Sequence, residues 1–79
     1  MVMNLNELSK VDACGTLCPV PILRAEEEIG RLRKGSLLEV SFTDSGAKED
    51  FKSWCRATGH ELVSLREDRP KYYARIRKN

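Results

Sequence analysis

The sequence predicts an α/β (α+β) protein built as a two-layer sandwich, in which two helices pack on one face of a four-stranded mixed sheet in the order βαβαββ. Two periodic patterns and the chain length carry this prediction. An apolar stripe at three- and four-residue steps indicates a helix, and strict alternation in "SLLEVSFTD" indicates a strand. With 79 residues there is room for one modest core, so residues 1–79 form a single domain with its core at about residues 7–78.

A strand and a helix are expected in the first half of the chain. Residues 7–12, "ELSKVD", predict a short first strand. Residues 19–34 predict a helix, and Gly35 stands where a left-handed C-cap would end it. The stripe that this helix would bury consists of Ile22, Ala25, Ile29 and Leu32.

The second half predicts a strand, a helix and a hairpin. Residues 36–44 form the strand, with Leu38, Val40 and Phe42 on its buried face. Asp44 or Ser45 would cap the second helix, which ends before Gly59. The segments "HELVSLRE" and "YYARIRK", joined by "DRPK", predict two paired strands. The expected buried side of the second helix comprises Ala47, Phe51, Trp54, Cys55 and Thr58.

Composition excludes several classes of protein. A hydrophobic fraction of 41% and a charged fraction of 33% are typical of a globular protein and unlike a disordered chain. A net charge of +2 is too small to indicate a nucleic-acid binder by itself. No apolar run is long enough for a membrane span, and "MVMNLNELSK" lacks the pattern of a signal peptide, so we expect a cytoplasmic protein. Three cysteines would then stay reduced as free thiols, metal ligands or core residues.

The most informative stretch is "CPVPI", residues 18–22, at the start of the first predicted helix. The first four N–H groups of a helix have no partner within it, so Pro19 and Pro21 would cost the helix no hydrogen bond. Cys18 would then be the N-cap, its sulfur at the positive end of the helix dipole and next to the Val20 N–H, with a lowered pKa. The alternative reading of these positions is that Cys18 is a small buried residue before a helix.

A resemblance to a known protein family favours the reactive reading of Cys18 over the buried one. "DACG" followed by "CPVPI" resembles the Cys-Pro-x-Pro signature of the TusA/SirA-like sulfur-carrier family. The segment that begins with "TD" and continues with "EDFKSWCRATGHEL" resembles the second-helix segment of the same family. The similarity covers roughly residues 10–78. It implies the fold described above, and a carrier that takes sulfane sulfur as a persulfide on Cys18 and hands it to an acceptor protein. Pro19 and Pro21 would support the site, with no cofactor and no metal.

The resemblance also implies protein partners. The sulfur donor would be a cysteine desulfurase or a rhodanese-type transferase, and the second partner a sulfur acceptor. The pathway could be tRNA thiolation, cofactor sulfuration or sulfur oxidation, and the residues do not choose among them. We expect neither a membrane nor direct nucleic-acid contact. Arg24 and Arg31, on the helix side opposite the apolar stripe, would steer acidic partner surfaces.

Two other cysteines keep alternatives open. Cys14 could resolve a persulfide on Cys18 or form a transient disulfide with it, or it could be a small side chain at a strand end. Cys55, next to Trp54 on the apolar side of the second helix, is better explained as core. A structural zinc site could instead use Cys14, Cys18, Cys55 and His60, which provide the number and kind of ligands that zinc takes.

A third hypothesis is an RNA or protein interaction module that uses the basic last strand. Tyr73, Arg75 and Arg77 would share its exposed face, whereas Tyr72 is better explained as core. One exposed aromatic side chain makes a small platform for stacking bases.

Overall fold

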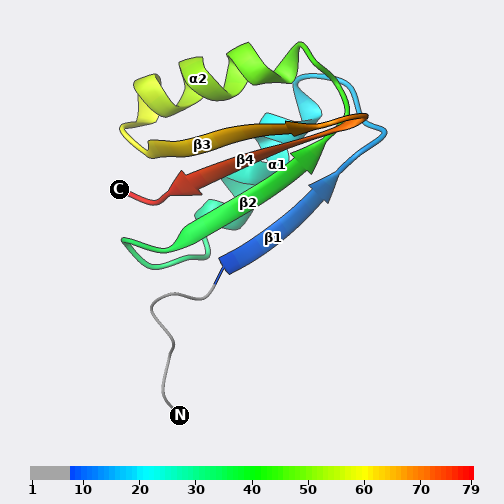
Figure 1. Cartoon of the computed structure of the whole chain (residues 1–79). Coiled ribbons are helices and arrows are strands. Elements are labelled where there is room, and N and C mark those ends of the chain that lie inside the picture. The colour runs from blue at the N-terminus through cyan, green and yellow to red at the C-terminus, as the bar shows by residue number, and fades with distance from the viewer. Residues whose placement is uncertain (1–7) are drawn as a thin grey trace.

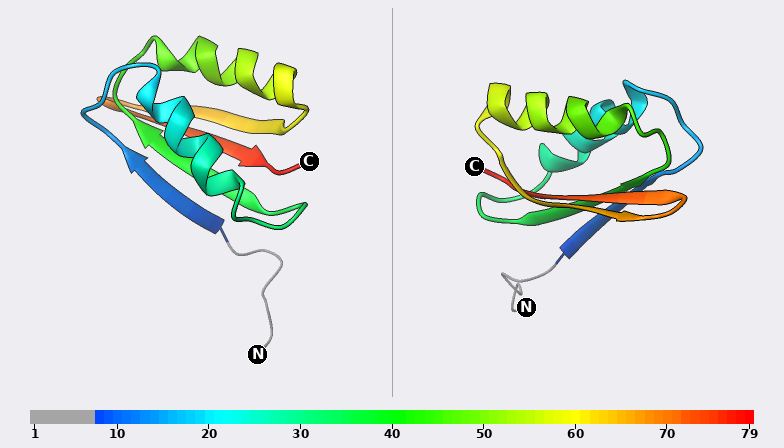
Figure 2. Two further views of the ribbon diagram at one scale, coloured as in Figure 1. Left: turned by 180° about the vertical axis from the view of Figure 1, so that it is seen from behind. Right: turned by 45° about the horizontal axis from the view of Figure 1, so that its top comes forward.

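The computed structural model describes residues 8–79, and it confirms the predicted order of strands and helices. Four strands form one sheet in the order β1-β2-β4-β3, with β1 parallel to β2 and the other neighbouring pairs antiparallel. Both helices cover the same face of this sheet (Figures 1 and 2). The elements are β1 (Leu8–Ala13), α1 (Val20–Ile29), β2 (Leu37–Phe42), α2 (Ala47–Thr58), β3 (Glu61–Asp68) and β4 (Lys71–Arg77).

In the first half, the end of the first helix differs from the predicted boundary, and the predicted start of the first strand is not tested. The predicted first strand began at Glu7, which lies outside the described residues. The first helix ends at Ile29 with Gly30 as its C-cap, not at Lys34, because a glycine stabilises a helical turn poorly. Gly35 does have a left-handed φ of 85°, but it belongs to the turn that leads into β2. In that turn the Lys78 ammonium donates a 2.6 Å hydrogen bond to the Leu32 carbonyl.

The core lies between the helices and the sheet, where sequence periodicity placed it, except that Thr58 at the end of α2 is exposed. Leu38, Val40 and Phe42 of β2 are fully buried, and the ring of Phe42 lies 5.2 Å from that of Phe51 in α2. The two helices are joined at the edge of the core, where the Trp54 indole N–H donates a 3.2 Å hydrogen bond to the Glu26 carboxylate. The other buried apolar residues include Ala13, Ala25, Ile29, Ala47, Cys55, Ala74 and Ile76.

One end of the molecule collects the ends of several elements. The carboxyl ends of β1 and β2 lie there together with the N-terminal ends of α1 and α2 (Figure 1). Two hydrogen bonds tie the loops at this end: the Gly15 N–H donates to the Thr43 hydroxyl at 2.9 Å, and the Cys18 N–H donates to the Asp44 carboxylate at 2.8 Å. The loop that carries the Cys-Pro-x-Pro motif is therefore held against the loop that leads into α2.

No helix among residues 8–79 is long and apolar enough to cross a membrane.

Candidate functional site

Cys18 lies in the loop just before α1, at the end of the molecule where the loops meet. It is not the N-cap. Pro19 takes that position without any side-chain capping bond, and the Val20 N–H donates to the Leu17 carbonyl at 2.9 Å instead of to the sulfur. The prediction of a capping thiol is wrong. The Val20 N–H, which was expected to donate to the Cys18 sulfur, instead donates to a backbone carbonyl within a turn.

The two prolines of the motif have different environments. Pro19 is exposed, and its carbonyl accepts a 3.0 Å hydrogen bond from the Leu23 N–H in the first turn of α1. Pro21 is the second residue of α1 and is fully buried. The helix start therefore rests on the core through Pro21, and Cys18 is carried on the segment immediately before it.

The Cys18 thiol donates a hydrogen bond to Oδ2 of Asp50, in the first turn of α2. That hydrogen bond, followed by partial burial and the negative charges of Asp50 and Asp44, raises the pKa of Cys18 from its ordinary value of 9.0 to about 11. The expectation of a lowered pKa is therefore wrong. The thiol faces the Asp50 carboxylate of α2, and Asp44 in the preceding loop adds a second negative charge. Both charges disfavour the thiolate, whereas the N-terminal end of a helix dipole would favour it.

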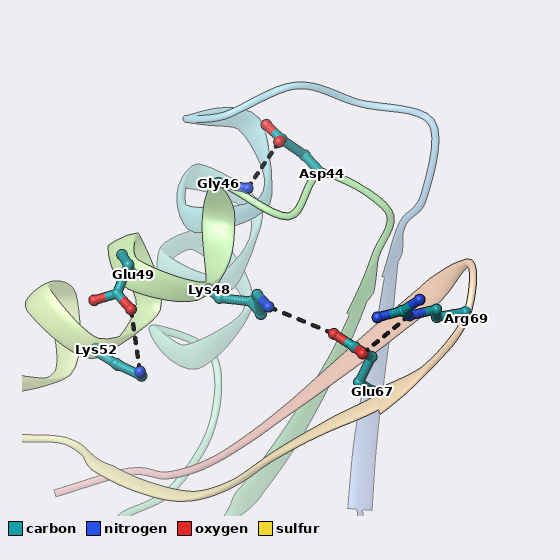
Figure 3. Close-up of polar contacts among 7 residues, drawn as sticks. All are labelled: Asp44, Gly46, Lys48, Glu49, Lys52, Glu67 and Arg69. Carbon is teal, nitrogen blue, oxygen red and sulfur yellow. Dashed lines mark hydrogen bonds and ion pairs between the residues drawn. The ribbon is translucent and has the colours of Figure 1, made fainter.

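Asp44 organises the backbone around the site. Its carboxylate accepts a hydrogen bond from the Cys18 N–H at 2.8 Å. It also accepts one from the Gly46 N–H at 3.0 Å (Figure 3). These two bonds lower the pKa of Asp44, that from Cys18 having the larger effect. Gly46, and not Asp44 or Ser45, is the N-cap residue of α2. Asp44 thus fixes the backbone of Cys18 to the start of α2.

The other two cysteines occupy less suitable positions for chemistry. Cys14 is half-buried at the end of β1, and its N–H donates to the Asp12 carboxylate at 2.9 Å. Burial, followed by a side-chain hydrogen bond of the thiol to Asp12, raises the pKa of Cys14. Cys55 is buried in the core, as predicted, and burial raises the pKa of its thiol as well. All three cysteines are free thiols.

The zinc alternative finds no ligand set in the structure. Cys55 lies in the core, and the His60 ring packs 5.4 Å from that of Trp54 while its Nδ1 accepts a 3.0 Å hydrogen bond from the Asn79 N–H. Among residues 8–79, no three His, Cys, Asp or Glu side chains are grouped so that they could hold a metal ion.

The basic strand that suggested an RNA-binding module is occupied by internal contacts. Tyr72 stacks on Phe42 at 5.4 Å, as expected of a core residue. On the open face of the sheet, the Arg66 guanidinium lies 4.8 Å from the centre of the Tyr73 ring, and Arg75 forms a 3.0 Å ion pair with the largely buried Glu39. These contacts use the aromatic and basic groups that a base-stacking platform would need.

Arg24 and Arg31 lie at different distances along α1 from Cys18. Arg24, in the first half of α1, donates a 3.1 Å hydrogen bond to the Asp12 carbonyl at the end of β1. Arg31 lies beyond the end of α1 and pairs with Glu27 at 3.2 Å and Glu28 at 3.6 Å. Arg24 is therefore the one of the two that lies toward the end of the molecule where Cys18 is found.

Sequence reasoning missed an apolar rim and an acidic partner. Leu17 and Leu23, on either side of the motif, are 75% and 55% exposed, and Val20 between them is 36% exposed. We call Leu17, Val20 and Leu23 the apolar rim. Single exposed apolar residues are ordinary, but three next to one free thiol form a docking candidate. Asp50 lies in the quoted "EDFKSW" segment, yet nothing in the linear sequence pairs it with Cys18.

The comparisons with known proteins identify the family of the chain. A family model described as "Sulfurtransferase TusA" matches residues 9–78, nearly the whole chain. The chain belongs to the TusA sulfurtransferase family. The sulfur carrier protein TusA of Allochromatium vinosum is 37% identical over 70 residues, covering 89% of this chain and 92% of that one. The sulfur carrier protein TusA of Pseudomonas putida is 35% identical over 68 residues, covering 86% and 85%.

A solved structure shows the same fold. The crystal structure of the SirA-like protein of Desulfitobacterium hafniense superposes with a TM-score of 0.77 at 21% sequence identity, covering 90% of this chain and 96% of that one. The predicted architecture of two helices on a four-stranded mixed sheet is therefore confirmed.

Proposed function

We propose that this TusA-family chain is a sulfur carrier, which accepts sulfane sulfur as a persulfide on Cys18 and relays it to an acceptor protein. The observation that carries the proposal is the position of Cys18. It is a partly exposed free thiol in the family motif, at the end of the molecule where the motif loop is tied to the start of α2. Cys55 is buried, and Cys14 directly follows β1, four residues before the Cys-Pro-x-Pro motif.

The transfer exchanges one sulfur–sulfur bond for another. In uptake, Cys18–SH and a donor persulfide R–S–SH give Cys18–S–SH and R–SH, and delivery to an acceptor thiol repeats the exchange. No oxidant or reductant is consumed, because the sulfane sulfur keeps its oxidation state. The chain acts as a stoichiometric relay, and its partners supply the rest of each transfer site.

The partners are proposed to be a cysteine desulfurase or rhodanese-type donor and a protein acceptor. A carrier of this kind works in the cytoplasm, where its three free cysteines stay reduced. The exposed apolar rim of Leu17, Val20 and Leu23 lies close to Cys18 in the chain and would be covered by each partner in turn. Arg24 and Arg31 would add electrostatic steering, and Arg24, nearer the thiol, would have the larger effect.

Intact-mass spectrometry after a single turnover with a sulfur donor tests the proposal. The wild type and the Cys14→Ser and Cys55→Ser variants should each gain one sulfur atom, and Cys18→Ser should gain none. Circular dichroism of each variant checks that it is folded. Loading of folded Cys18→Ser would overturn the assignment of Cys18, and loss of loading in Cys14→Ser would show that Cys14 takes part in the transfer.

A further inference from the structure

Two carboxylates accept hydrogen bonds from Cys18. The Cys18 thiol donates to Oδ2 of Asp50, and the Cys18 backbone N–H donates to Asp44 at 2.8 Å. Asp50 belongs to the first turn of α2, and Asp44 belongs to the loop between β2 and α2. A thiolate at Cys18 would be an anion next to two anions, whereas a protonated thiol can donate to one of them.

The lysines on either side of Asp50 in the sequence have other partners. Lys48 pairs with Glu67 at 3.4 Å, and Lys52 pairs with Glu49 at 3.1 Å (Figure 3). From α1, the first side chains after the motif are Ile22 and Leu23, which carry no charge. Within residues 8–79, the charged groups that act on the Cys18 thiol are thus both carboxylates, Asp50 and Asp44.

We propose that Asp50 holds the proton of Cys18 in the free carrier and accepts that proton during sulfur transfer. This inference rests on the proposed function, since it gives Asp50 a role in the same exchange. The hydrogen bond from the thiol to Asp50 is the geometry that both roles require: it stabilises the S–H bond at rest, and it places a base on the reacting atom. The free carrier is then a poor target for small electrophiles.

The transfer step balances without any further reactant. As Sγ of Cys18 attacks the terminal sulfur of R–S–SH, its proton moves to the Asp50 carboxylate. The new Sγ–S bond forms while the donor S–S bond breaks, and the electron pair of the broken bond stays on the donor sulfur. Asp50 then returns the proton to that sulfur, giving R–SH and Cys18–S–SH.

The Asp50→Asn variant tests the two roles of Asp50 separately, because the rate of Cys18 alkylation is expected to rise and the rate of sulfur loading is expected to fall. The first is alkylation of Cys18 in the free protein by iodoacetamide, a neutral reagent, followed from pH 6 to pH 11 with the alkylated peptide identified by mass. Asp50→Asn should move the apparent pKa of this profile downward. A fall of one to two pKa units would raise the thiolate fraction at neutral pH about 10- to 100-fold. The lower nucleophilicity of a more acidic thiol leaves a net gain in rate of about 3- to 10-fold.

The second rate is single-turnover loading of Cys18 by a persulfide donor, which should fall in Asp50→Asn because the base is gone. A merely structural role of Asp50 would move both rates in the same direction. Glu49→Gln is the matched control, because it removes the same charge from the neighbouring residue, whose side chain is 75% exposed and pairs with Lys52. It should leave both rates near those of the wild type. Asp50→Glu, which keeps a carboxylate, should retain a raised pKa and serves if Asp50→Asn does not fold.

The possible results bear separately on the holding role of Asp50, on its role as a base and on the sulfur-carrier function. An unchanged or slower alkylation rate in folded Asp50→Asn, with an unchanged pH profile, would overturn the holding role. Loading that rises in proportion to alkylation would overturn the role as a base. Absence of loading in the wild type, with the alkylation profile shifted as expected, would refute the sulfur-carrier function while leaving the holding role of Asp50 intact.

Discussion

Pro21 offers a quantitative test of how the motif is anchored to the core. The proline is fully buried as the second residue of α1, and the Pro21→Ala change removes two ring carbons from that site. At about 0.8 kcal/mol for each buried CH₂, the lost burial costs about 1.6 kcal/mol. The greater freedom of the unfolded alanine chain adds about 0.4–1 kcal/mol. The expected loss of unfolding free energy is therefore about 2 kcal/mol.

Thermal and urea unfolding, followed by circular dichroism, measure this loss. In a domain of this size about 2 kcal/mol corresponds to a fall in Tm of roughly 8–16 °C. Leu17→Ala is the matched control, because it truncates an apolar side chain in the same segment that is 75% exposed, and it should change the free energy of unfolding by less than about 0.5 kcal/mol. Pro21→Ala should still fold and still load sulfur on Cys18.

Two results would contradict this reasoning. A loss below about 0.5 kcal/mol in Pro21→Ala would mean that the buried ring contributes no packing energy. Complete unfolding would mean that the helix start cannot form without the proline, so that Pro21 is essential to the fold and not only to its stability.

The remaining predictions concern acid, a turn, docking and metal. The lowered pKa of Asp44 stabilises the folded state above the unfolded carboxyl pKa of about 3.9, and this stability is lost as the pH falls through the lower folded value. The unfolding free energy of Asp44→Asn in urea should therefore depend less on pH below about 5 than that of the wild type. An equal pH dependence of the two unfolding free energies would contradict this. Gly59→Ala should cost about 1–2 kcal/mol in urea unfolding, because φ is 84° and the new Cβ would lie 3.0 Å from Nδ2 of Asn79; an unchanged midpoint would contradict it. Arg24→Glu should slow stopped-flow transfer to the acceptor at low salt and matter less at high salt, without changing alkylation of Cys18, and a salt-independent defect would argue against docking. Chelation with EDTA should leave the Tm unchanged, and a lower Tm would revive the zinc hypothesis.

The fold followed from the sequence because the patterns that specify it are local. Alternation in β2 identified Leu38, Val40 and Phe42 as core residues, and helical spacing identified Phe51 and Trp54. Each of these side chains is buried because its own element presents one face to the other layer. Local periodicity was therefore sufficient to predict the layers and the buried faces.

The candidate site followed only in part, because its chemistry depends on contacts between distant residues. The motif identified Cys18, but the partner of its thiol is Asp50, which lies on the other helix. A prediction from the α1 dipole alone gave the wrong direction for the pKa of Cys18. The end of α1 was misplaced for a related reason, since Leu32 continues the apolar stripe and packs against the core from the turn beyond Ile29.

Cyanolysis of the loaded carrier tests the central claim most directly, because cyanide removes only sulfane sulfur and converts it to thiocyanate. The account predicts about one thiocyanate for each chain of donor-treated wild type, with return of the protein to its unloaded mass. It predicts no thiocyanate from Cys18→Ser treated in parallel. An equal yield from the folded Cys18→Ser variant, or a wild-type mass gain that cyanide does not remove, would contradict the claim that Cys18 carries transferable sulfur.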